Sequence, residues 1–146
     1  MKAICVFSFL FILLCMPLHA QTGANKFPLY LKLKTVETDT TTGIVKIMKR
    51  GGAYKDIKFN KDHAIELDLN SYYLIQFSKK GYVTKVVYVD TKVPVGRDRE
   101  AFAKFTMTAE LHKEVTGVKV DTSKPVGGVK YVEVEQDFDA VDNTMK

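Results

Sequence analysis

Apolar and polar residues alternate with a period of two over most of this chain. The alternation runs in segments of five to nine residues, separated by Gly, Pro, Asn, Asp, Ser and Thr. Side chains of a β-strand point alternately to its two faces, so this period predicts strands with one buried and one solvated face. Strands are predicted over residues 30–36, 44–49, 57–59, 65–69, 72–78, 83–89, 101–111, 118–120 and 129–134. A helix competes only over 101–111, where Phe and two Thr favour a strand.

Two parts of this pattern predict packing directly. In 65–69, the three apolar residues are predicted to face the core, with Glu66 and Asp68 facing water. Segments 72–78 and 83–89 are predicted to form a hairpin, because Gly81 lies in the short turn between them. The predicted core residues are Ile65, Leu67, Leu69, Ile75, Phe77, Val87, Phe105 and Met107.

Seven to nine short strands with turn residues about every ten positions predict one all-β domain, an antiparallel β-sandwich or a small barrel. Segments 89–96 and 120–127 agree at six of eight positions, each with Asp-Thr followed by Pro. We interpret this internal similarity as two segments that each follow a strand, in which the Asp and Thr side chains hydrogen-bond to the local backbone. A duplicated functional site is the less favoured interpretation.

The first 20 residues have the pattern of a secretory signal peptide. A basic start precedes an apolar run over 3–14, and Ala20 is a small residue before Gln21. The run is shorter than the roughly 20 residues needed to cross a bilayer. We expect cleavage near Ala20, export to the periplasm or the extracellular or outer-membrane side, and no transmembrane segment in the mature chain. Lipidation at Cys15 is the alternative, although Leu14 stands where lipoprotein signals have a small residue.

Candidate catalytic and metal-binding residues are few. Cys5 and Cys15 both fall in the predicted leader, so the mature chain has no cysteine for a disulfide, a metal or a nucleophile. His63 and His112 lack a third ligand at a motif-like spacing, and no cofactor is expected. Residues 137–143 resemble half of a calcium loop without its turn Gly and closing Glu, and are interpreted as an acidic solvated tail.

Charge is unevenly distributed along the chain. The net charge of +5 combines Lys2 of the predicted leader, residues 21–130 with 20 basic and 12 acidic residues, and residues 131–146 with one basic and five acidic residues. This asymmetry suggests a basic surface for an anionic partner, such as an envelope polysaccharide, or alternatively a solvated face. The candidate surface residues are Lys46, Lys49, Arg50, Lys79, Lys80 and Lys85. The acidic tail is predicted to dock on the basic body with salt-sensitive order, and without a reading motif no nucleic acid is expected.

The predicted hairpin also carries a family resemblance. Residues 73–85, followed by Asp90, Thr91 and Pro94, resemble the exported carboxypeptidase-regulatory-like domains common in Bacteroidetes. The resemblance covers residues 29–111 and implies a transthyretin-like (prealbumin-like) Greek-key sandwich of about seven strands. It brings no catalytic residues, because such domains serve as folding or binding modules. It gives Gly81, Tyr82, Asp90 and Thr91 structural roles in the hairpin.

These patterns divide the chain into a signal peptide (1–20), a linker (21–28), a β-sandwich (29–115), and a C-terminal β extension with an acidic tail (116–146). The expected function is that of an exported, non-enzymatic envelope module that binds a protein or polysaccharide partner or has a structural role. A carrier of a small apolar ligand is one alternative. A small hydrolase of unknown substrate, using His63 or His112, is another.

Overall fold

A computed structural model describes residues 25–37, 42–59, 63–117, 119 and 121–141 of the chain. The predicted signal peptide, with Cys5 and Cys15, and most of the predicted strand 118–120 lie outside the described residues. The strands are β1 (Lys26–Thr35), β2 (Gly43–Lys49), β3 (Tyr54–Phe59), β4 (His63–Asp68), β5 (Tyr72–Ser78), β6 (Lys85–Asp90), β7 (Phe105–Leu111), β8 (Gly128–Val132) and β9 (Asp137–Ala140). In this part of the chain no helix is long and apolar enough to span a membrane.

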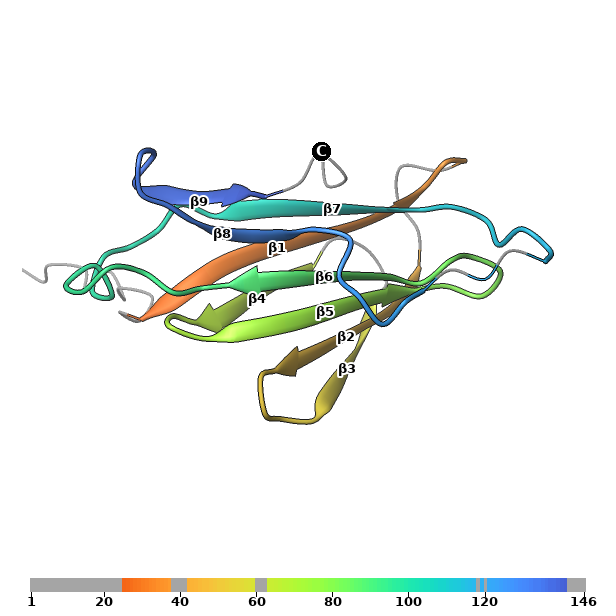
Figure 1. Ribbon diagram of the computed structural model, residues 1–146, viewed down its shortest axis with the longest axis horizontal. Coiled ribbons are helices and arrows are strands. Elements are labelled where there is room, and N and C mark those ends of the chain that lie inside the picture. Colours follow the sequence, from red (N-terminus) through yellow and green to blue (C-terminus); the bar gives the residue numbers. More distant parts are fainter. Residues whose placement is uncertain (1–24, 38–41, 60–62, 118, 120, 142–146) are drawn as a thin grey trace, which may run out of the picture.

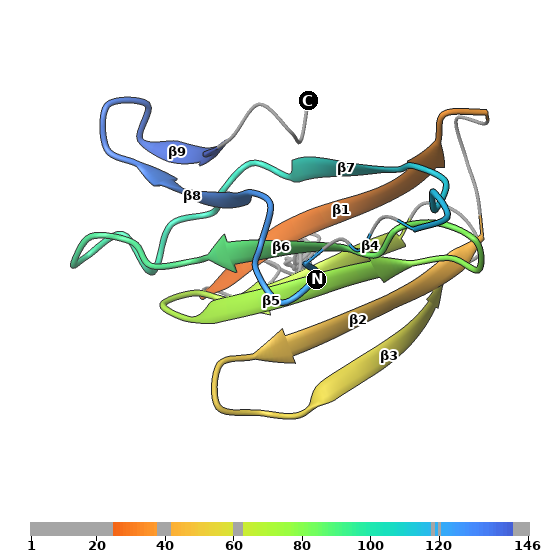
Figure 2. The same cartoon turned by 45° about the vertical axis from the view of Figure 1, so that its right-hand side comes forward.

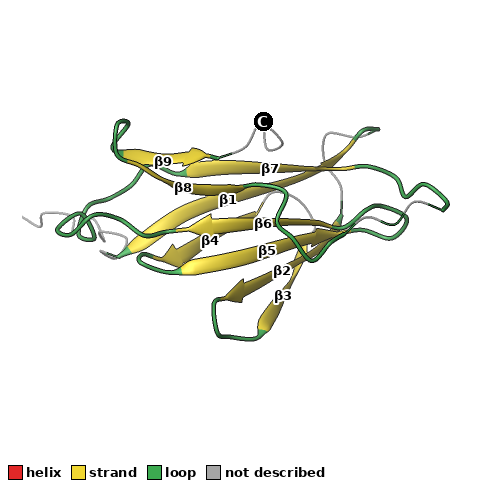
Figure 3. Cartoon of the chain, viewed as in Figure 1, coloured by secondary structure: helices red, strands yellow, loops and turns green. Residues whose placement is uncertain are grey.

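The strands form two sheets, one layered on the other (Figures 1 and 2). One sheet has six strands in the order β3-β2-β5-β6-β8-β9, and the other has three in the order β4-β1-β7. Figure 3 shows that loops and turns make up the remainder of the described chain. The predicted all-β sandwich of seven to nine strands is confirmed.

Each sheet contains one parallel pair, which the predicted antiparallel arrangement did not include. β1 runs parallel to β7, and β6 runs parallel to β8, while the remaining pairs are antiparallel. Parallel neighbours need a crossover between them rather than a tight hairpin turn. Here the chain leaves β6, forms β7 in the opposite sheet, and returns to place β8 beside β6.

The first strand begins earlier than predicted, and residues 26–28 of the predicted linker belong to it. Phe27 is fully buried. Pro28 has no N–H to donate, and proline is therefore found mainly at the margins of sheet pairing. It lies where β1 pairs with β4 alone, since pairing with β7 starts at Leu29.

The prediction for β5, 72–78, agrees with the structure at both ends.

The predicted acidic solvated tail is wrong over residues 137–140, which form β9. This strand pairs antiparallel with β8 and completes the six-stranded sheet. Phe138 is 6% exposed, and its ring centroid lies 4.1 Å from that of Phe27 on β1. The described contacts of β9 are thus backbone pairing and aromatic packing. Residues 142–146 lie outside the described part of the chain.

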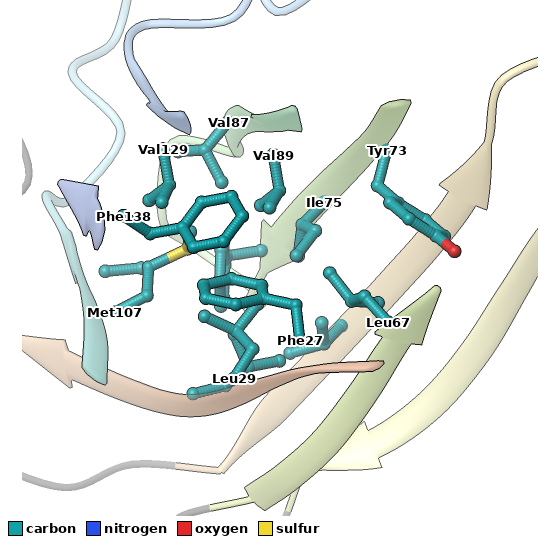
Figure 4. Packing of buried hydrophobic residues seen from close by; sticks show 14 of the residues in the cluster. Phe27, Leu29, Leu67, Tyr73, Ile75, Val87, Val89, Met107, Val129 and Phe138 are labelled. Carbon is teal, nitrogen blue, oxygen red and sulfur yellow. The ribbon is translucent and has the colours of Figure 1, made fainter. Parts of the chain in front are cut away.

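The space between the sheets is filled by apolar side chains (Figure 4). Of the eight predicted core residues, six are buried and two, Ile65 and Phe105, pack against the buried cluster. The rings of Phe27 and Phe138 lie at the centre of this view, with Met107 and Leu29 around them. The largest fully buried side chains are Phe27, Phe59 and Phe77.

Candidate binding face

The six basic residues predicted as a partner-binding surface do not form one patch. β2 and β5 are antiparallel, so Lys49 and Arg50, at the end of β2, lie near the start of β5. Lys79 and Lys80 follow the end of β5, at the opposite end of the pair. Lys49 is opposite Tyr73, six residues before Lys79, so the two groups are about 20 Å or more apart. They therefore form two small groups at opposite ends of the sandwich.

Three members of that set, Lys46, Lys49 and Lys85, are engaged within the fold. Lys46 lies 3.8 Å from Asp56 on the neighbouring strand, and the Lys49 ammonium lies 2.9 Å from the Asp68 carboxylate. Lys85 is half-buried, and burial lowers the pKa of its ammonium group. These contacts leave less of the predicted positive charge available for a partner.

Gly81 and Tyr82 lie in the turn between β5 and β6. Gly81 has φ of 81°, a left-handed conformation that favours glycine, and the Tyr82 N–H donates to the Lys79 carbonyl at 3.1 Å. The Tyr82 hydroxyl donates to the Glu37 carboxylate at 3.2 Å. The turn thus leads from β5 into β6 and is tied to the residues that follow β1.

Asp90 and Thr91 hold the other end of the hairpin. Thr91 is fully buried, and its hydroxyl lies 2.7 Å from the carbonyl of Asp68 and 2.8 Å from that of Ser71. It also accepts from the Ser71 N–H at 3.0 Å. Asp90 accepts from the Lys92 N–H at 3.1 Å, which turns the chain out of the sheet. The Asp-Thr exit therefore fastens β6 to the corner between β4 and β5.

The two histidines lie in different places. His63 is opposite Leu31 of β1, whereas His112 follows Leu111, which is opposite Thr35. The register places them two strands and at least four residues apart, more than about 15 Å. Among the described residues, no group of three His, Cys, Asp or Glu side chains could hold a metal ion.

The feature that the sequence reasoning missed is an apolar row on the outer face of the six-stranded sheet. Met48 pairs with Tyr54 of β3 on one side and Leu74 of β5 on the other, and Leu74 pairs with Tyr88 of β6. Directly paired residues share a face, so these four side chains form a line across the strands, which we call the outer row. Tyr54 is 43% exposed, and the other three are half-buried.

One end of the outer row is an aromatic platform. Tyr88 pairs with Gly128 of β8, and a Cβ atom on Gly128 would lie only 2.4 Å from the Tyr88 ring. The ring therefore lies over the bare backbone of Gly128. The Tyr72 ring is stacked beside it, with centroids 5.8 Å apart and planes 9° from parallel. Burial, with Tyr88 and Asp90 nearby, raises the pKa of the Tyr72 hydroxyl.

Polar side chains flank the outer row on both sides. The register places one polar line beside the row over β3, β2 and β5, and another over β6, β8 and β9. These lines consist of Asp56, Lys46 and Gln76, and of Asp90, Lys130 and Asp139. Together they hold two ammonium groups and three carboxylates, and they supply both hydrogen-bond donors and acceptors.

A signal for this face is present in the sequence. Strands β5 and β6 carry Leu74 and Tyr88 at positions where alternation calls for polar residues. The apolar character of 83–89 predicted a central strand, which β6 is, but a central strand of a two-layer sandwich still has one outer face. Comparison with known protein families and with curated proteins finds no match.

Proposed function

We propose that this chain is an exported, non-catalytic binding module of the cell envelope, and that it binds its partner through the outer row. The observation that carries the proposal is the row itself. The outer face of an antiparallel sheet is commonly solvated and polar, whereas a contiguous exposed apolar patch marks an interaction site. Tyr54, Met48, Leu74 and Tyr88 make a partly exposed apolar row of this kind across four strands.

Export and the absence of catalysis are supported by the sequence and by the positions of the histidines. Residues 1–20 have the pattern of a signal peptide. The hairpin of β5 and β6 resembles that of exported modules without catalytic residues. The wide separation of His63 and His112 offers no shared proton-transfer pair. The filled interior of the sandwich favours surface binding over the carriage of an apolar ligand (Figure 4).

The test is retention of envelope material by the immobilised protein. A cell-envelope extract of the source organism is passed over the wild-type protein and over a Leu74→Ser/Tyr88→Ser variant. We expect a component that the wild type retains and the variant does not, because the variant replaces two adjacent apolar side chains of the outer row with small hydroxyl side chains. The retained component is then identified by mass spectrometry and by sugar analysis.

The matched control is Tyr30→Ser, which removes a tyrosine from the outer face of the other sheet. Circular dichroism and urea unfolding establish that each variant is folded. Retention that survives in Leu74→Ser/Tyr88→Ser, or that is lost equally in Tyr30→Ser, contradicts the outer row as the binding surface. N-terminal sequencing of the envelope-fraction protein tests export, with Gln21 expected as the first residue.

A further inference from the structure

We propose that the ligand of the outer row is an uncharged polysaccharide chain that lies across the strands, with Tyr88 and Tyr72 stacking on its sugar rings. This inference rests on the proposed function, because it names the chemistry of the partner that the outer row binds.

The aromatic platform has the chemistry that sugar recognition needs. A pyranose ring has faces lined by C–H groups and an edge of hydroxyls, so its face packs on an aromatic ring, whose π-surface is electron-rich. The Tyr88 ring is held over Gly128, and the Tyr72 ring is 9° from parallel to it. The two rings therefore have a common orientation before any ligand binds, which lowers the entropic cost of binding.

The polar flanks match hydroxyl groups better than they match a charged polymer. The chain as a whole has a net charge of +5, but the two lines beside the outer row hold two ammonium groups and three carboxylates, and Arg50, whose charge acts on Tyr72, brings the two signs to equal numbers. An anionic polymer gains no net attraction from such a surface. Hydroxyls donate and accept, and Gln76 and the charged groups of both signs supply partners for each role. The basic residues in the sequence suggested an anionic partner, whereas this face favours an uncharged one.

The shape of the row fits a linear chain. The row crosses β3, β2, β5 and β6 and ends over Gly128 on β8. Four strand spacings give it a length of about 19 Å. An oligosaccharide of several residues therefore contacts the apolar side chains along its faces while its hydroxyl edges meet the polar lines.

The experiment separates aromatic stacking from apolar docking at one position. Binding of the full protein to soluble xyloglucan, β-1,3-glucan, mannan and α-1,4-glucan is measured by affinity electrophoresis, with alginate and polygalacturonate as anionic polymers. Tyr88→Phe keeps the ring, and Tyr88→Leu keeps apolar surface without it. We expect at least one uncharged polymer to bind, with affinity kept in Tyr88→Phe and reduced roughly five- to tenfold in Tyr88→Leu. Tyr72→Leu removes the second ring of the platform and is expected to lower the affinity for the same polymer by a similar factor.

Tyr30→Leu is the matched control and leaves binding unchanged. Three results overturn the inference: no uncharged polymer binds, only the anionic polymers bind, or Tyr88→Leu and Tyr72→Leu both bind like the wild type. Unchanged binding in both leucine variants would indicate that a protein, or a second copy of this chain, binds the outer row through apolar contacts. In each case the retention experiment decides the proposed function separately. If retention of the envelope component still requires Leu74 and Tyr88, the proposed function stands without the inference. If retention does not require them, both fail.

Discussion

The outer faces of the two sheets arise from the same alternating pattern but carry different side chains: charged residues on the three-stranded sheet, and an apolar row on the six-stranded sheet. On the three-stranded sheet, Lys34 of β1 and Glu110 of β7 form an ion pair at 2.8 Å across neighbouring strands. The single tyrosine on that strand face, Tyr30, has the Lys104 ammonium 4.4 Å from its ring centroid. On the six-stranded sheet, the corresponding central positions are tyrosine, methionine and leucine in one row.

The difference lies in how each outer face is occupied. On the three-stranded sheet, the charged side chains of Lys34 and Glu110 pair with each other across neighbouring strands. The outer row presents apolar surface, and covering this surface by a partner is favourable because it removes apolar area from water. β8 and β9 occur only in the six-stranded sheet, and they supply Gly128 beneath Tyr88 and the carboxylate of Asp139 beside it. The C-terminal strands are therefore part of the candidate binding face.

The largest expected effect comes from releasing those C-terminal strands. Phe138→Ala removes the side chain that packs β9 on Phe27, and we expect the free energy of unfolding to fall by about 3–5 kcal/mol. Hydrogen exchange is expected to accelerate over residues 128–140 more than in β1 and β4. Urea unfolding and exchange mass spectrometry measure the two quantities.

Val134→Ala is the control, because Val134 lies in the turn of the same β8–β9 hairpin and is 95% exposed. We expect it to change the unfolding free energy by less than about 0.5 kcal/mol. If high salt releases β9 in the wild type while Phe138→Ala has no effect, then charge rather than aromatic packing holds the strand, as the sequence had suggested.

A smaller effect is expected from a methyl group beneath the platform. Gly128→Ala places a Cβ atom 2.4 Å from the Tyr88 ring, so the ring must move off β8. Overpacking of this kind costs about 1–3 kcal/mol, and the platform loses its orientation. We expect lower stability in urea and a changed chemical environment for the Tyr88 ring protons in NMR spectra.

A double-mutant cycle with Tyr88→Ala identifies the cause. Without the ring, the Gly128 substitution is expected to cost much less, since the two changes share one contact. Equal costs in the two backgrounds would mean that the ring does not lie over Gly128. Such a result would remove the pre-oriented platform and leave only the apolar row.

Local pattern was enough to predict most of the strands and the core. β5 was predicted to the residue because alternating large apolar side chains are bounded by turn residues on both sides. The inward positions of β4 and β7 followed from alternation alone, and Leu67 and Met107 are buried as predicted. β9 was missed because two of its four residues are Asp, and its one anchor, Phe138, packs on a residue more than 100 positions away in the sequence.

The candidate site could not be predicted because it is a property of register. Tyr54, Met48, Leu74 and Tyr88 come from four strands, and nothing local to any one of them fixes its alignment with the next. The predicted basic surface failed as a single patch for the same reason. Its lysines are near in sequence to the turns, but antiparallel pairing sends Lys49 and Lys80 to opposite ends of β2 and β5.

The smallest expected effect concerns the three-stranded face and its ion cluster. Asp68 at the end of β4 binds the ammonium groups of Lys26 and Lys49, and its backbone N–H donates to the Tyr73 hydroxyl at 3.0 Å. The hydrogen bonds from Lys26 and Lys49 lower the pKa of the Asp68 carboxyl from 3.8 to about 2. Lys49 comes from β2 of the six-stranded sheet, so the cluster links the two sheets.

A carboxyl with a lowered folded-state pKa stabilises the fold above its unfolded pKa, and this contribution is lost as the pH falls from about 4 to about 2. Because the groups are exposed, Asp68→Asn is expected to cost no more than about 1 kcal/mol at neutral pH and less in high salt. The difference between wild type and variant in urea unfolding should shrink steadily below pH 4 and be small at pH 2. Glu66→Gln is the control, since it removes a carboxylate from the same outer face and leaves both ammonium contacts of Asp68 in place. A wild-type advantage over Asp68→Asn that persists unchanged at pH 2 would show that the carboxylate charge is not its source, and that the Asp68 carboxyl contributes through packing instead.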